Sequence, residues 1–170
     1  MIRNIHWLAG LSVAASFCVY PIAADAYQAP RKVQDEAAHY RRMAQEKISG
    51  GQLTDGVKLL RLAIKTNPVD PVLRMDYVTV MSKKGEQSLK DGNRNEAIAV
   101  FKSVEEELMS AAKLFKDAGD RSNAAHALSQ VAQIYHYVYR NEPTARGYFD
   151  KAVELDPGSA QIRSMAMQTS

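Results

Sequence analysis

Cysteine is nearly absent from this sequence of 170 residues, since Cys18 is the only one. Phe17 stands directly before it, where a lipid-modified cysteine would require a small residue, so the pattern does not indicate a lipid anchor. Cys18 also falls within an N-terminal segment that we expect to be removed. The rest of the chain then has no thiol for a disulfide, a cysteine metal site or nucleophilic catalysis. Its stability must come from packing alone.

The sequence also lacks the short motifs that mark common active sites, namely HExxH, GxSxG, Walker A and GxGxxG. Beyond residue 26 its histidines are His39, His126 and His136. The last two are ten residues apart on one predicted helix and so do not share a face, and we find no carboxylate close in sequence to either. We therefore predict no catalytic residue, no metal site and no cofactor. The net charge of +3 is too small to indicate nucleic-acid binding.

Residues 1–26 have the pattern of a secretory signal peptide. Arg3 supplies a positive start, residues 5–20 are mostly apolar, and Ala24-Asp25-Ala26 fits a small-x-small cleavage site. We predict cleavage after Ala26, a periplasmic or secreted location, and no membrane insertion after cleavage. An uncleaved membrane anchor is the alternative. It is disfavoured because the apolar run is shorter than the roughly 20 residues that span a bilayer.

Most of the remaining chain has apolar residues at spacings of three and four, which predict amphipathic helices, and no stretch alternates as a strand would. Glycine and proline turns separate these periodic segments. We expect a flexible leader at 27–34, an all-α domain at 35–158 made of three antiparallel hairpins, and a short C-terminal helix or tail at 159–170. The predicted helices cover about 35–49, 55–66, 71–90, 95–115, 123–139, 143–155 and 160–167. The glutamates at 105–107 interrupt one apolar face, and we interpret them as solvated.

One short pattern occurs three times, each time in the predicted second helix of a hairpin. The clearest copy is Ala145, Phe149, Ala152 and Pro157; the others are Gly56, Leu60, Ala63 and Pro68, and, more weakly, Ala97, Phe101 and Val104. Small residues let two helix backbones approach closely, and large ones fill the remaining gaps. A single hairpin leaves an apolar face uncovered, so such units must stack on one another.

These phrases resemble the tetratricopeptide repeat (TPR), a helix-turn-helix unit of 34 residues, over roughly 35–158. The resemblance implies a right-handed α-α superhelix of about three irregular repeats. Leu60 and Phe101 are 41 residues apart, and Phe101 and Phe149 are 48 apart, so the spacing exceeds 34 by seven and then by fourteen. Such heptad-sized insertions return a helix to nearly the same facing. We therefore expect longer helices in the middle and last hairpins, with a compact irregular bundle as the alternative.

The resemblance further implies that a partner lies in a groove formed by the first helices of the hairpins. Carried over residue by residue, the groove candidates are Arg41, Gln45, Ile48, Ser82, Glu86, Gln130, Ile134 and Tyr137, with Arg42 and Lys83 beside them. The pair Arg41-Arg42 is suited to bind a carboxylate, and Tyr137 is suited to be an aromatic anchor. The alternatives are a solvated face for the charged residues and a packing role for the tyrosines.

The leading hypothesis is a non-catalytic protein-interaction module of the cell envelope that binds a segment of another envelope or secreted protein. The main alternative is a structural subunit or assembly factor of an envelope complex that docks through its outer face. The surface that carries exposed apolar side chains discriminates the two. Small-molecule or metal binding is less favoured and would need an enclosed polar pocket. A homodimer is a further alternative if apolar area remains uncovered.

Overall fold

The computed structural model describes residues 29–167, so the predicted signal peptide at 1–26 and the end of the tail at 168–170 lie outside the described residues. The described part is all-helical and contains no strand, as predicted. Its elements are α1 (Arg31–Ser49), α2 (Leu53–Thr66), α3 (Pro71–Lys90), α4 (Arg94–Asp117), α5 (Arg121–Gln133), the π-helical segment η2 (Ile134–Tyr139), α6 (Glu142–Leu155) and α7 (Ala160–Met167).

Local sequence signals set most helix ends. Asp70 caps α3 by accepting a hydrogen bond from the Val72 N–H at 2.8 Å, and Pro71 occupies the first turn, where no N–H is needed. Gly92 closes the turn between α3 and α4 with a φ of 79°, a left-handed conformation that suits glycine.

The predicted leader at 27–34 was wrong in its second half. α1 begins at Arg31, because the Pro30 carbonyl accepts hydrogen bonds from the next turn.

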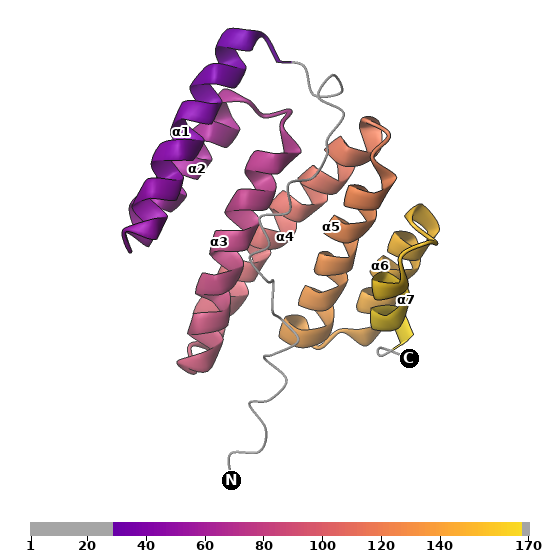
Figure 1. Cartoon of the computed structure of the whole chain (residues 1–170). Helices are drawn as coiled ribbons and strands as arrows, with labels where there is room; N and C mark the ends of the chain where they lie inside the picture. Colours follow the sequence, from indigo (N-terminus) through magenta and orange to yellow (C-terminus); the bar gives the residue numbers. More distant parts are fainter. Residues whose placement is uncertain (1–28, 168–170) are drawn as a thin grey trace.

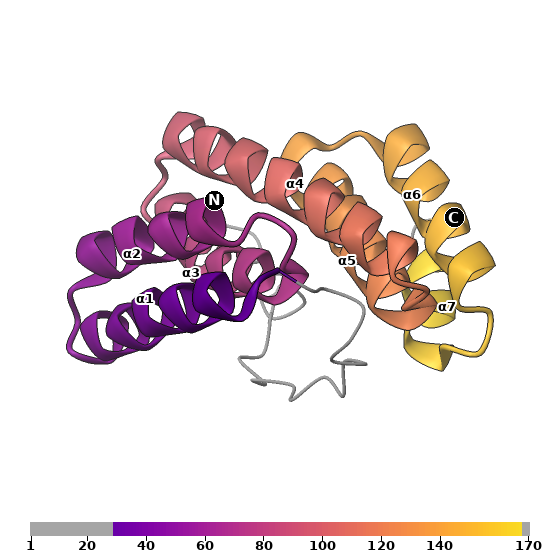
Figure 2. The ribbon, with the colours of Figure 1, turned by 90° about the horizontal axis from the view of Figure 1, so that it is seen from above.

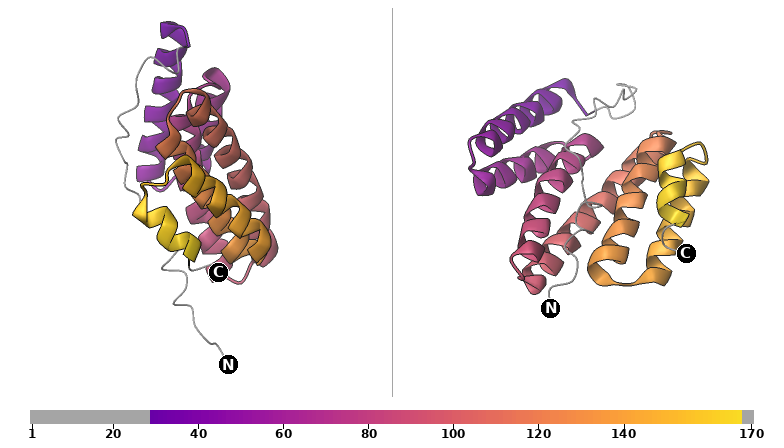
Figure 3. Two further views of the ribbon diagram at one scale, coloured as in Figure 1. Left: turned by 90° about the vertical axis from the view of Figure 1, so that its right-hand side faces the viewer. Right: turned by 60° about the horizontal axis from the view of Figure 1, so that its bottom comes forward.

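Consecutive helices form three hairpins, α1–α2, α3–α4 and α5–α6, and α7 packs against α6 and α5 (Figure 1). Seen from above, alternate helices lie in two layers (Figure 2). We call α1, α3, α5 and α7 the first layer, and α2, α4 and α6 the second layer. The side view shows how flat this arrangement is, and the tilted view shows the α1–α2 hairpin set at an angle to α3 (Figure 3).

The long α3–α4 hairpin forms the centre of the molecule. α4 has 24 residues, against 14 in each of α2 and α6, so the prediction of elongated helices holds for α4. α3 has 20 residues and α5 with η2 spans residues 121–139, so both are about as long as α1, which has 19. The predicted elongation of α3 and of the last hairpin was therefore wrong. The largest core cluster runs along α4 through fully buried Phe101, Val104 and Leu108. Burying a side chain the size of Phe101 stabilises the fold by roughly 1.5–3 kcal/mol.

The last six residues of the predicted 123–139 helix are π-helical rather than α-helical. The widened turn keeps Ile134 and Val138 buried, and it ends at Arg140, whose φ of 58° is left-handed. The Asn141 N–H closes the segment with a hydrogen bond to the Tyr135 carbonyl at 2.9 Å. Among the described residues, no helix is long and apolar enough to span a bilayer.

Candidate interaction surface

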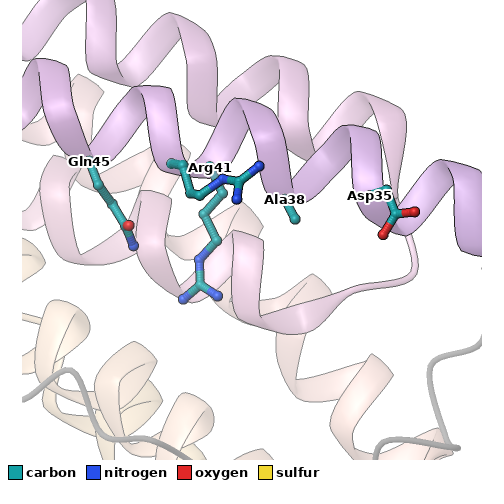
Figure 4. A pocket seen from close by; sticks show the side chains of 5 residues that line it. Asp35, Ala38, Arg41 and Gln45 are labelled. Atoms are coloured by element: carbon teal, nitrogen blue, oxygen red, sulfur yellow. The ribbon is translucent and has the colours of Figure 1, made fainter.

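An open depression of about 370 Å³ lies along one side of α1. Asp35, Ala38, Arg41, Arg42 and Gln45 line it, at the three- and four-residue spacings of one helical face. Figure 4 shows Asp35, Ala38, Arg41 and Gln45 in a row along this side of the helix. We call these five residues the α1 surface. Three of the ten groove candidates from the sequence, Arg41, Arg42 and Gln45, belong to it.

The two arginines of the α1 surface differ in their surroundings. Arg41 forms a bidentate pair with Asp76 of α3, with Nε–Oδ2 and Nη2–Oδ1 distances of 2.5 and 3.3 Å. Burial raises the pKa of the Asp76 carboxyl, and the Arg41 guanidinium opposes that rise. Arg42 is exposed and forms no ion pair with any described residue. The prediction that both arginines are available for a partner's carboxylate is therefore wrong for Arg41, which an internal carboxylate already engages.

Three groove candidates are packing residues instead. Ile48 contacts Gly56 across the first hairpin, so closely that a Cβ built at Gly56 would lie 2.4 Å from its Cγ1 atom. Ser82 is 3% exposed and Ile134 is 3% exposed. Standard repeat positions would place these side chains on a groove wall. In this chain the neighbouring helices lie close enough to cover them.

A small cavity lies between α3 and the end of α5, over the buried side of α4. Ser82 on one side and Gln130, Gln133 and Ile134 on the other enclose a cavity of only about 10 Å³, above the floor that Phe101, Val104 and Leu108 form. That volume holds about one water molecule. The groove candidates Ser82, Gln130 and Ile134 therefore line only this small cavity, whereas Arg41, Arg42 and Gln45 line the larger open depression of the α1 surface.

Two polar groove candidates, Gln130 and Glu86, differ in whether they have a hydrogen-bond partner within the protein. The Gln130 side chain lies 2.8 Å from His126 Nε2, and burial lowers the pKa of the His126 imidazole. Glu86 is half-buried, and its Oε1 atom has no hydrogen-bond partner. Burial raises the pKa of the Glu86 carboxyl, which Lys90 and Lys83 oppose. Lys83 itself is exposed.

Two tyrosines of η2 form hydrogen bonds with Glu105, a residue that the sequence pattern predicted to be solvated. Tyr135 and Tyr139 donate hydrogen bonds to the two carboxylate oxygens of Glu105 on α4, at 2.8 and 3.2 Å. Tyr135 also stacks on Tyr148 of α6, with ring centroids 5.5 Å apart. The hydrogen bond to the Glu105 carboxylate raises the pKa of the Tyr135 hydroxyl to about 12. These tyrosines fill the junction of α4, η2 and α6, as the packing alternative predicted.

The other two glutamates of the 105–107 run differ from each other in exposure. Glu107 forms an ion pair with Arg74 of α3 and is half-buried, whereas Glu106 is exposed. The solvated-face interpretation therefore holds only for Glu106. Tyr137 is half-buried and stacks edge-on against His136, with centroids 4.3 Å apart. It is thus partly exposed, and its role as an aromatic anchor stays a prediction. Sequence spacing located Tyr135 and Tyr139 on one face, but their partner is 30 and 34 residues away.

The described residues contain no cluster of three or more metal-ligating side chains. His136 Nδ1 lies 2.7 Å from Glu142 Oε2, so the statement that no carboxylate is close to this histidine was wrong; it follows six residues later. This pair ties η2 to the start of α6. Met165 accepts a hydrogen bond from the Gln133 amide, which is a packing contact.

No protein-family model matches this chain. No curated protein is significantly similar to it.

Proposed function

We propose that this chain is a non-catalytic protein-interaction module of TPR type, acting in the cell envelope. Two layers of alternating helices support this proposal, because stacked helical hairpins produce that arrangement. Its contacts also use the small residues that the repeat pattern requires. Ala44, Ala63, Ala97 and Ala152 are each 0% exposed. Gly85 packs against the Phe101 ring so closely that a Cβ added at Gly85 would lie 2.7 Å from a ring atom.

We propose the α1 surface as the place where a partner segment binds. The observation that carries this choice is exposed Arg42, unpaired beside the open depression that Gln45, Ala38 and Asp35 also line. A guanidinium in that position suits a partner carboxylate, from an acidic side chain or a chain end. Asp35 at the other end favours a cationic group, so the row suits an extended segment with both charges.

The test begins with photo-crosslinking residues placed at positions 42 and 45 in intact cells, followed by identification of the captured protein. A matched position is 146 on the exposed side of α6, far along the sequence and in the second layer. We expect one partner to be captured at 42 and 45 and not at 146. The same capture at all three positions would contradict the choice of surface.

A quantitative arm uses the identified partner and purified proteins. Arg42→Ala should weaken binding about tenfold, since losing one charged contact of an interface costs about 1–2 kcal/mol. Arg146→Ala is the control and should bind as the wild type does. Unchanged affinity of Arg42→Ala would sink the assignment of Arg42.

A second candidate function is that of a structural subunit that docks through the second layer. The specific observation is the placement of exposed large apolar side chains among the described residues. Leu62 of α2 is 44% exposed, and Ile98 and Met109 of α4 are 36% and 39% exposed, whereas α1, α3 and α5 carry none. Outside these helices, Val69 of the α2–α3 turn and Met167 of α7 are also exposed. Capture of a partner at positions on α2 or α4 instead of α1 would favour this candidate.

A further inference from the structure

The exposed side of α4 carries a stripe of charged and apolar residues. Its members, all exposed and spaced as one helical face, are Asn95, Ile98, Ala99, Lys102, Glu106, Met109 and Lys113. Figure 2 shows α4 in the second layer between α2 and α6. A helix of 24 residues is about 36 Å long, and the stripe, from residue 95 to residue 113, runs along most of it. We call these residues the α4 stripe.

The α4 stripe is nearly symmetric about Val104. Lys102 and Glu106 stand two residues on either side of it, and Ala99 and Met109 stand five residues away. If a second α4 runs antiparallel across this point, Lys102 of each copy faces Glu106 of the other. Met109 of each copy then meets Ala99 and its neighbour Ile98. Opposite charges and apolar groups both match in this one register.

The central charges are available for such a contact. Lys102 and Glu106 are four residues apart, yet they form no ion pair with each other or with another described residue. The order lysine before glutamate is also the weaker one for a pair within a single helix. Both charged groups are therefore available to form an ion pair with another molecule.

We propose that the α4 stripe is a contact between two copies of this chain, packed antiparallel about a two-fold axis that passes near Val104. A two-fold contact is self-complementary by nature, with each residue pair occurring twice. An unrelated partner would not require the symmetric placement of Lys102, Glu106 and the flanking apolar residues. A single helix pair buries a small area, so the dimer is expected to be a weak one. This inference does not rest on the α1 surface.

Charge reversal tests the register. Lys102→Glu places like charges opposite each other in a dimer of that variant, and so does Glu106→Lys. Each variant alone should dimerise at least about tenfold more weakly than the wild type, by sedimentation of the purified protein over a concentration series. A one-to-one mixture of the two variants should dimerise again, because both cross-pairs are then opposite in charge. The double variant Lys102→Glu with Glu106→Lys should also recover.

Arg42→Glu is the matched control, because it reverses one exposed charge in the first layer and should leave dimerisation unchanged. All substituted residues are exposed, and circular dichroism should show unaltered helix content. A monomeric wild type at the highest concentration reached would overturn the proposal. Single variants that dimerise as the wild type does would overturn it too, and a mixture that fails to recover would overturn the antiparallel register.

Discussion

Glu86 is one of three described residues with a buried side-chain polar atom that has no hydrogen-bond partner, the others being Asn67 and Arg74. Its Oε1 atom is buried without a hydrogen-bond partner, and burial raises the pKa of its carboxyl above the ordinary value of 4.5. Lys90 and Lys83 lower that pKa only in part. Arg41, by contrast, is satisfied by Asp76 of another helix. Whether a charged residue of the first layer is satisfied thus depends on its partner on another helix rather than on its spacing along its own helix.

The raised pKa of Glu86 makes its contribution to stability depend on pH. A carboxyl with a higher pKa in the folded state favours folding while protonated, and that contribution is lost as pH rises from 4.5 through the folded-state value. Glu86→Gln should therefore be more stable than the wild type at pH 7, by no more than about 0.5 kcal/mol, because solvent screens this half-exposed carboxyl. The difference should vanish below about pH 4. Urea unfolding at both pH values measures it, with Glu154→Gln of exposed α6 as the control. An advantage of equal size at both pH values would refute this account.

Individual glycines, as well as apolar faces, determine how closely the helices of this chain pack together. Gly85 of α3 lies against the Phe101 ring of α4, which is itself 0% exposed and cannot move away. Gly147 of α6 is different, because a Cβ added there would meet nothing within 4 Å. The same residue type therefore has a packing role in one helix and none in the other.

Alanine at these two glycines should change stability in opposite directions. Gly85→Ala should lower the free energy of unfolding by about 1–3 kcal/mol, because the new methyl overlaps the Phe101 ring. Gly147→Ala should raise it by about 0.5–1 kcal/mol, since alanine restricts the unfolded chain and favours helix. Urea unfolding of both variants checks the pair. If both changed stability with the same sign, the close contact at Gly85 would not be the cause.

At the scale of the whole molecule, the first hairpin is joined to the rest by a limited set of contacts. α2 packs on α3, and two polar links cross the same boundary: Arg41 with Asp76, and Arg61 with the Tyr77 hydroxyl at 2.9 Å. Tyr77 is otherwise buried at the centre of the core. In stacked hairpins each unit is stabilised chiefly by its neighbour, so an end unit depends on such links.

Removing the Arg41 link should loosen the first hairpin selectively. Arg41→Ala leaves the buried Asp76 carboxylate unpaired and should cost about 1–3 kcal/mol. Amide hydrogen exchange should become faster in α1 and α2 and change little in α5 and α6. Arg42→Ala is the matched control and should stay within about 0.5 kcal/mol of the wild type. Uniform acceleration along the chain would mean that the hairpin does not open on its own.

Much of the fold could be predicted because it depends on local patterns. The periodic apolar residues predicted seven helices, and the Asp70-Pro71 start and the glycine turns predicted most boundaries to within a few residues. The heptad excess predicted the long α4, but α3 is only about as long as α1. The π-helical form of η2 could not be read in this way, because it accompanies contacts of Tyr135 and Tyr139 with Glu105 on another helix.

The candidate site was predictable only in outline. Spacing along a helix placed Arg41, Arg42 and Gln45 on one face, and that face is open. Spacing could not show that Asp76 engages Arg41, that Ser82 and Ile134 are covered, or that Glu105 holds two tyrosines. The sequence by itself determined the helices, their turns and their stacking as hairpins, because these follow from contacts between near neighbours. The tertiary structure alone decided that Arg41 is paired and Arg42 is not, because the partner of Arg41 is Asp76, 35 residues away on another helix.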